Sequence, residues 1–341
     1  MTATGRDCNV LIVAHFKEHL VERLQSLSPG LHIVLHPGRD GETVPAEVWR
    51  DVEVAYTFAN HLPEPEQAPH LRWVQLFSAG AERVLDHPLF HTEVRFTTTS
   101  GIHAVAIAEY VLATTLAWFQ RLPALLQWKQ QHEWHAWSSD IETREEIQGK
   151  TIGIVGYGSI GRQVARLAKS FGMRVLAMQR SSDHRDTGFT LPGQGDPEGV
   201  LPERYYAPEE LHALLHESDV VVIALPLTRQ THYLFNAEAF NAMKPSAFLI
   251  NIARGDICDE DALIDALREK RIAGAALDVF HREPLPADSP LWDLPNVIMS
   301  PHVTGWHAEY VEHAAMVFEE NLRRYLAGEP LINEVHKELE Y

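Results

Sequence analysis

The chain contains few cysteines and no long apolar segment. Cys8 and Cys258 are the only cysteines among 341 residues, so neither a disulfide framework nor a zinc cluster is indicated. No stretch is apolar for long enough to span a membrane, and the N-terminus lacks the basic start and apolar core of a secretion signal. We therefore expect a cytoplasmic protein with no membrane partner.

Positive charge is also scarce, because 29 Lys and Arg face 47 Asp and Glu, for a net charge of −18. Such a chain has no general surface for nucleic acid or anionic lipid, although a few arginines can still dominate one small site. His132 and His135 have a spacing found in metal sites. No acidic or cysteine ligand completes a set there, so we expect no metal.

The most informative stretch is residues 151–180. A buried strand is followed by Gly156-Tyr157-Gly158-Ser159-Ile160-Gly161, an amphipathic helix and a second buried strand. This context is the one that a dinucleotide-binding fingerprint requires. Gly156 makes the tight turn, Gly158 lets the backbone approach a pyrophosphate, and Gly161 lets the helix pack closely on the strand. The pyrophosphate then binds at a helix N-terminus.

The tip of the second strand indicates which nucleotide is preferred. NAD-binding folds usually place an acidic residue there for the ribose hydroxyls, whereas this chain has Gln179, Arg180 and Ser181. No carboxylate repels a 2′-phosphate, and Arg180 can pair with one. We therefore predict NADP(H) as the preferred cofactor, with NAD(H) as the alternative.

Residues 181–204 are rich in Gly, Pro and charge, and they read as a surface loop. Because the loop follows the predicted 2′-phosphate pocket, it either covers the adenosine end of the cofactor or is a mobile insertion. The second alternative predicts that deletion of residues 184–203 spares the fold.

The first hundred residues resemble a separate small α/β unit without a glycine fingerprint, which suggests a substrate domain. Strands are expected at residues 8–14, 31–35, 52–57, 71–77 and 94–98. Ser78-Ala79-Gly80-Ala81 follows one of them, and it is either a carboxylate-binding turn or an ordinary connection. The long apolar helix at 101–120 suggests burial between domains or subunits. We expect residues 123–147 to form an arm at a subunit interface.

Three polar residues follow further predicted parallel strands: Arg254, Glu283 and His302. The carboxyl ends of parallel strands are where ligands bind in doubly wound sheets. Reduction of a 2-oxo acid needs a cation for the carboxylate and carbonyl, which arginine supplies. It also needs an acid to protonate the developing alkoxide, for which histidine is suited. A carboxylate beside the histidine orients the ring and favours its charged form.

With these residues, the chain resembles the D-2-hydroxyacid dehydrogenase family. The matching stretches are GYGSIG at 156–161, LPLT at 225–228, NIARG at 251–255, LDVF at 277–280, REPL at 282–285 and SPHVTG at 300–305. They follow one another in order over roughly residues 50–330, so the match is specific. The absent acidic ribose residue and the long 181–204 loop depart from the family pattern.

The resemblance implies two doubly wound parallel-sheet α/β domains, with a Rossmann nucleotide-binding domain (101–305) inserted into a flavodoxin-like substrate domain (1–100 and 306–341). It implies that Arg254 binds the substrate, that His302 is the general acid and base, and that Glu283 pairs with His302. It further implies that Ala79 and Gly80 offer backbone N–H groups to the substrate carboxylate. The predicted cofactor-binding residues are Gly156, Gly158, Ser159, Ile160, Gly161, Arg180, Ser181, Pro226, Ile252, Ala253, Asp278 and His302.

Family members are usually dimers, which the 101–147 arm suits. The leading hypothesis is therefore an oxidoreductase that transfers a hydride between NADP(H) and a small 2-oxo acid or D-2-hydroxy acid, resembling glyoxylate and hydroxypyruvate reductases. One alternative is an NAD-dependent dehydrogenase of another substrate. Another is a nucleotide-sensing, corepressor-like binding protein, because a shared fold does not by itself establish catalysis.

Overall fold

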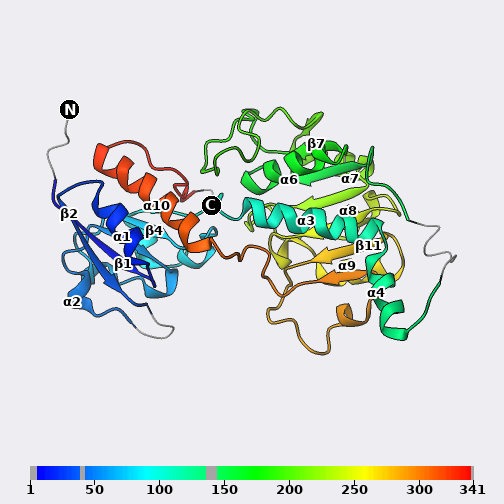
Figure 1. Ribbon diagram of the computed structural model, residues 1–341, viewed down its shortest axis with the longest axis horizontal. Helices are drawn as coiled ribbons and strands as arrows, with labels where there is room; N and C mark the ends of the chain where they lie inside the picture. Colours follow the sequence, from blue (N-terminus) through cyan, green and yellow to red (C-terminus); the bar gives the residue numbers. More distant parts are fainter. Residues whose placement is uncertain (1–5, 39–42, 136–143, 339–341) are drawn as a thin grey trace. The chain divides into compact units, whose positions relative to one another are not determined.

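The computed structural model describes residues 6–38, 43–135 and 144–338, which fall into two compact units (Figure 1). The first unit contains the chain up to Ile102, the short stretch Thr187–Phe189, and the chain from His307 onward. The second contains His103–Asp186 and Thr190–Trp306. The stretch 187–189 was not anticipated in the first unit. There the Phe189 N–H donates a hydrogen bond to Asn333 Oδ1 at 3.1 Å.

The first unit is a five-stranded parallel sheet with the order β2-β1-β3-β4-β5, a flavodoxin-like arrangement. Its strands are β1 (Cys8–Val13), β2 (Leu31–His36), β3 (Val54–Thr57), β4 (Trp73–Leu76) and β5 (Arg95–Thr97). Its helices are α1 (Glu18–Gln25), α2 (Ala46–Trp49) and α10 (Tyr310–Ala327).

The strands β1, β3 and β4 of this sheet are almost entirely buried, because helices cover both of its faces, whereas β2 at the edge is largely exposed. Leu20 of α1 and Phe318 of α10 are buried against one face, where Phe318 stacks on Tyr56 with ring centroids 4.7 Å apart. Trp49 of α2 is buried against the other face.

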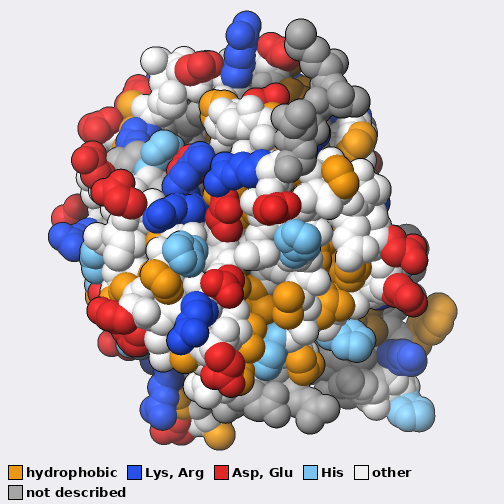
Figure 2. Space-filling model, turned by 90° about the vertical axis from the view of Figure 1, so that its left-hand side faces the viewer, with side chains coloured by type: hydrophobic (Ala, Val, Ile, Leu, Met, Phe, Trp, Pro, Cys, Tyr) orange, Lys and Arg blue, Asp and Glu red, His pale blue; other side chains and the backbone are white. Residues whose placement is uncertain are grey.

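Figure 2 looks onto the left-hand side of Figure 1, where acidic, basic, histidine and hydrophobic side chains are interspersed.

The second unit is a seven-stranded parallel sheet with the order β12-β11-β10-β9-β6-β7-β8. Chain order reverses between β6 and β9, as in a Rossmann fold, and ligands bind at such a switch point. The strands are β6 (Thr151–Val155), β7 (Arg174–Met178), β8 (Arg204–Tyr206), β9 (Val220–Ile223), β10 (Phe248–Asn251), β11 (Gly274–Leu277) and β12 (Val297–Met299). The helices are α3 (Ala104–Phe119), α4 (Leu122–Gln131), α6 (Ser159–Ser170), α7 (Leu211–Glu217), α8 (Ala237–Ala242) and α9 (Glu260–Arg268).

Helices cover both faces of this second sheet. α3 and α6 bury one face with residues such as Val111 and Val164, while α7, α8 and α9 bury the other. Trp118 of α3 stacks on Phe248 of β10 with ring centroids 4.7 Å apart. The apolar character of α3, which suggested burial between domains or subunits, is thus largely explained by the core of its own unit.

The predicted two-domain parallel α/β fold is confirmed. Asp259 caps the N-terminus of α9, because its side chain accepts a hydrogen bond from the Ala262 N–H. The short edge strand β8 was missed, since its three residues follow a loop and carry no periodic pattern. In the described residues, no helix combines the length and apolarity needed to cross a bilayer.

Candidate active site

The structure brings Glu283 and His302 together at the carboxyl ends of β11 and β12. His302 Nδ1 lies 2.7 Å from Glu283 Oε2, and the other carboxylate oxygen accepts the Phe280 N–H at 3.1 Å. The two side chains are 45% and 38% exposed, so a small molecule can reach them within this unit. Because Nδ1 is taken by the carboxylate, Nε2 is the ring nitrogen that remains for proton transfer.

The backbone of His302 is left-handed, with φ +53°, which is a strained conformation for a residue other than glycine. Its N–H donates to the carbonyl oxygen of Asp278 at 2.8 Å. The buried Asp278 carboxylate then accepts hydrogen bonds from Ser300 Oγ, the Val303 N–H, the Thr304 N–H and Thr304 Oγ1. A carboxylate has about four acceptor sites, so the loop carrying His302 uses all of them. Asp278 thus holds the loop of residues 300–304, here called the His302 loop, in place by hydrogen bonds.

Helix α3 supports the same loop. Ser300 Oγ lies 2.6 Å from Asp278 Oδ1 and 2.8 Å from the hydroxyl of Tyr110. Burial raises the pKa of the Tyr110 phenol above its usual value, which keeps the hydroxyl protonated. Tyr110 and Ser300 were missed at the sequence level, because nothing in the sequence pairs a helix residue with a loop 190 positions away.

Arg254 is positioned by the last residue of β10. The Asn251 side chain accepts the Ala253 N–H at 3.1 Å and donates to the Arg254 carbonyl at 3.0 Å. The half-buried Arg254 donates from Nη1 to the Ala253 carbonyl at 2.7 Å. Asn251 was not singled out as a site residue, although a polar residue at the end of an otherwise apolar strand is a usable signal.

The three fingerprint glycines have different surroundings. Gly156 has φ +108°, which favours glycine in the turn after β6. An ideal Cβ at Gly161 lies only 2.3 Å from the Gly156 carbonyl oxygen, so α6 packs directly on the turn. An ideal Cβ at Gly158 meets no atom within 4 Å. Open space at the start of α6 fits a pyrophosphate that approaches the backbone.

The 181–204 loop is fastened to this turn by a buried carboxylate. Asp196 Oδ2 lies 2.7 Å from the Tyr157 hydroxyl, and the Asp196 carbonyl accepts from Arg162 Nη1 at 2.6 Å. Both partners belong to the fingerprint turn or to α6. Asp196 is 5% exposed and also accepts the N–H groups of Val200 and Leu201. Apart from Thr187–Phe189, which belong to the first unit, the loop is therefore a packed part of the second unit, which argues against a mobile insertion.

The remaining predicted residues follow other strand ends. Arg180 is exposed two positions after β7, and the hydroxyl of the exposed Ser181 accepts the Asp183 N–H. Pro226 follows β9 and is exposed, whereas Ile252 and Ala253 follow β10 and are buried. Ser159 and Ile160 begin α6. Ala79 and Gly80 belong to the first unit, in a turn held by a 2.8 Å bond from Ser78 Oγ to the Gly80 carbonyl.

Across the described part of the chain, no group of three or more His, Cys, Asp or Glu side chains is arranged to hold a metal ion. The site contains an arginine, a histidine–carboxylate pair and a glycine turn of the dinucleotide-binding type. Such a set can bind an anion, transfer a proton and hold a dinucleotide.

Comparison with known proteins identifies the class. Residues 112–304 match the model of the D-isomer specific 2-hydroxyacid dehydrogenase NAD binding domain. A glyoxylate reductase of Thermococcus kodakarensis is 33% identical over 341 residues, covering 97% of this chain and 96% of that protein. The chain belongs to the D-isomer specific 2-hydroxyacid dehydrogenase family, and it is an NAD(P)-dependent oxidoreductase.

Two solved structures are similar over nearly the whole chain. One is a D-isomer specific 2-hydroxyacid dehydrogenase from Xanthobacter autotrophicus in complex with NADPH and MES, with TM-score 0.79, 29% identity, and coverage of 98% of this chain and 100% of that one. The other is an NADPH-dependent glyoxylate/hydroxypyruvate reductase from Sinorhizobium meliloti in complex with NADP and sulfate, with TM-score 0.76, 27% identity and the same coverage. These relatives do not favour the corepressor-like alternative.

Proposed function

We propose that this protein reduces a small 2-oxo acid, such as glyoxylate or hydroxypyruvate, to the 2-hydroxy acid with NADPH. The observation that carries the proposal is the accessible His302–Glu283 pair, with Arg254 on the neighbouring strand end of the same unit. The Thermococcus relative, a glyoxylate reductase, and the Sinorhizobium relative, a glyoxylate/hydroxypyruvate reductase, support this substrate class.

In this proposal, the guanidinium of Arg254 binds the substrate carboxylate and polarises the carbonyl, because its planar fork matches two oxygens. In the first unit, Ala79 and Gly80 stay the predicted backbone N–H donors for a substrate carboxylate. A nicotinamide bound by the second unit would supply the hydride for the carbonyl carbon. His302 Nε2 gives its proton to the carbonyl oxygen, which completes the hydroxyl group, and Glu283 on Nδ1 holds the ring in the orientation for that transfer. In oxidation the same nitrogen accepts the proton.

We assign most of the predicted cofactor residues to two places. Gly156, Gly158 and Gly161, with Ser159 and Ile160, hold the pyrophosphate at the start of α6. Pro226, Ile252 and Ala253 line the cofactor at the ends of β9 and β10. Because the Asp278 carboxylate is saturated, we assign it to positioning the His302 loop, and a bond to the nicotinamide carboxamide would require rearrangement of that loop.

The preference for NADP(H) is tested by Arg180→Ala. If Arg180 and Ser181 bind the 2′-phosphate, the loss of a charge-assisted bond costs about 1.5–3 kcal/mol, so KM for NADPH rises roughly 10- to 100-fold while KM for NADH changes little. Arg185→Ala is the matched control, since that arginine is on the same loop and its side chain is 73% exposed. Equal losses for both nucleotides would remove the 2′-phosphate role.

A homodimer through the 101–147 arm also belongs to the proposal. α4 has no buried residue, and Leu122 and Leu126 are 44% and 59% exposed, as an interface helix in an isolated chain is expected to be. Residues 136–143 of this arm are outside the described ones. Leu126→Asp should convert a dimer into a monomer in light scattering. We also keep the cytoplasm as the expected location, since Cys8 and Cys258 are both buried free thiols.

The proposed activity is tested by initial rates with glyoxylate, hydroxypyruvate and the bulkier phenylpyruvate, each with NADPH and NADH. Turnover with NADPH that is lost in His302→Ala is the expected result. Activity with NADH alone would keep the class and reverse the cofactor preference. If no 2-oxo acid is turned over, the reductase proposal fails.

A further inference from the structure

The loop that carries Arg254 and the loop that carries Glu283 touch directly. They follow β10 and β11, which are paired in the sheet. An ideal Cβ at Gly255 lies 2.0 Å from the Phe280 carbonyl carbon and 2.4 Å from the His281 nitrogen. Only a residue without a side chain allows this approach, so the two backbones are pressed together between the predicted catalytic residues.

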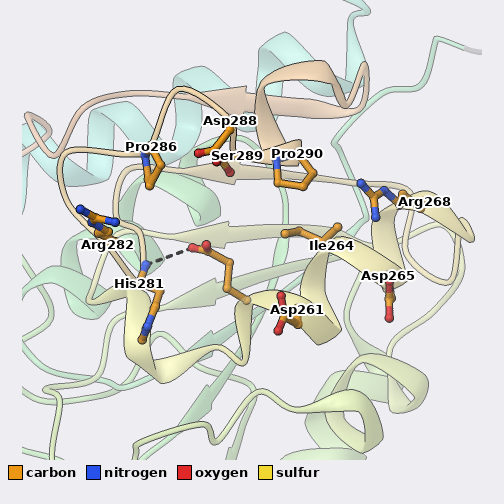
Figure 3. Close-up of a pocket in the computed structure, with 11 residues that line it drawn as sticks. Asp261, Ile264, Asp265, Arg268, His281, Arg282, Pro286, Asp288, Ser289 and Pro290 are labelled. Atoms are coloured by element: carbon orange, nitrogen blue, oxygen red, sulfur yellow. Dashed lines mark hydrogen bonds between the residues drawn. The ribbon is translucent and has the colours of Figure 1, made fainter.

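Two carboxylates hold His281 across this contact. His281 Nδ1 pairs with Asp256 Oδ1, and the His281 N–H donates to Glu260 Oε2 at 3.0 Å. The second bond is the dashed line in Figure 3, where His281 and Arg282 lie beside α9 on the rim of a pocket of about 520 Å³. None of the three predicted catalytic side chains lines that pocket. The His281 ring is 55% exposed, so burial does not explain why it is held there.

The paired residues Asp256 and His281 are both close in the chain to predicted catalytic residues. Asp256 is two residues after Arg254, and His281 is two residues before Glu283. Glu283 in turn is held between the Phe280 N–H and His302. The Asp256–His281 bond therefore connects the loop of Arg254 to the loop of Glu283. Within the second loop, Glu283 is two residues from His281 and bonds to His302.

We propose that His281 is a positioning residue whose bond to Asp256 sets the placement of Glu283 and His302 relative to Arg254. This inference rests on the proposed reductase function. An exposed ion pair contributes only about 0–1 kcal/mol to folding stability, so a purely structural role would change little. A displacement of about 1 Å at a catalytic group can instead cost roughly 100-fold in rate.

The charges around His281 make the placement dependent on pH. Asp256 is the main group facing the ring, Glu260 and Asp261 of α9 are further acids, and Arg282 is the adjacent cation. The hydrogen bond and charge of Asp256, with smaller effects of Glu260 and Asp261, raise the pKa of His281 above its usual value. The charged pair is therefore complete below the ordinary histidine pKa and weakens as pH rises through the raised value.

The decisive comparison is His281→Ala with His281→Asn. The asparagine amide nitrogen lies near the place of Nδ1, so it keeps a neutral donor for Asp256 without the titrating charge. We expect kcat/KM for the 2-oxo acid to fall about tenfold or more in His281→Ala, and to be largely restored in His281→Asn with a flatter alkaline pH profile. Asp261→Asn is the control, because it removes a nearby charge and should stay within about twofold of the wild type.

A second readout does not need turnover. Hydrogen exchange in a peptide covering residues 278–286 should accelerate in His281→Ala and not in His281→Asn. Wild-type exchange together with wild-type kcat/KM in His281→Ala would overturn the inference, as would a loss of kcat/KM that His281→Asn fails to restore. Faster exchange in a protein whose wild type reduces no 2-oxo acid would support the placement by His281 and refute the proposed function alone.

Discussion

The fingerprint turn allows ligand binding to be separated from packing with two alanine substitutions. Gly158 has φ −85° and ψ −164°, which any residue adopts, and open space where its Cβ would lie. Gly161 has backbone at 2.3 Å in that direction. Gly158→Ala should therefore leave the apo protein unchanged and weaken cofactor binding, whereas Gly161→Ala should damage the fold itself.

The Gly161 substitution should lower folding stability, whereas the Gly158 substitution should lower the affinity for the cofactor. At Gly161 the clash is with a carbonyl oxygen of the turn, which cannot swing away, so a cost of about 1–3 kcal/mol for overpacking applies. For domains of this size, each kcal/mol lowers the melting temperature by roughly 2–4 °C. At Gly158 a methyl group displaces the pyrophosphate from the backbone N–H groups. One lost charge-assisted hydrogen bond corresponds to about 1.5–3 kcal/mol, or roughly 10- to 100-fold in Kd.

Both variants should be measured by thermal unfolding without nucleotide and by fluorescence titration with NADPH. The expected pattern is a wild-type melting temperature with weakened binding for Gly158→Ala, and a lowered melting temperature for Gly161→Ala. Unchanged NADPH affinity in Gly158→Ala would refute the placement of the pyrophosphate. A melting temperature lowered equally in both variants would show that Gly158 is needed for packing.

Two further predictions concern buried carboxylates. Asp278→Asn replaces two of the four acceptor sites of this side chain with N–H donors. The loop that carries His302 should then shift, and kcat should fall at least about tenfold in steady-state assays. As the control, Asp293→Asn at an exposed position should leave steady-state rates unchanged. Asp196→Ala removes the partner of Tyr157 and of two backbone N–H groups and should lower the free energy of unfolding by about 2–4 kcal/mol in denaturant titrations, against about 1 kcal/mol for Tyr157→Phe. Equal losses in those last two variants would contradict a role for Asp196 beyond the tyrosine.

Local chemistry and strand pattern were sufficient to predict the two parallel sheets and the glycine turn after β6. They also predict that Arg254, Glu283 and His302 follow strands at one sheet edge, where the structure pairs Glu283 with His302. Apolar runs mark strands that are covered on both faces, and parallel strands bring their carboxyl ends to one edge. The glycine spacing marks a turn whose backbone must come close to a pyrophosphate and to the following helix. These features depend on residues that are neighbours in the chain, or on the rule that parallel strands end at the same edge of a sheet. They can therefore be predicted from the sequence.

The tertiary structure alone decided which loop residues meet. Tyr157 and Asp196 are 39 positions apart, and Asp256 and His281 are 25 apart. The loops that carry them have no period from which their paths can be predicted. For the same reason the sequence could not show that the Asp278 carboxylate is fully occupied by the His302 loop. Residue type and order thus predict the chemistry proposed for this site, whereas the path of each loop, set by long-range packing, decides how the side chains of the site are held.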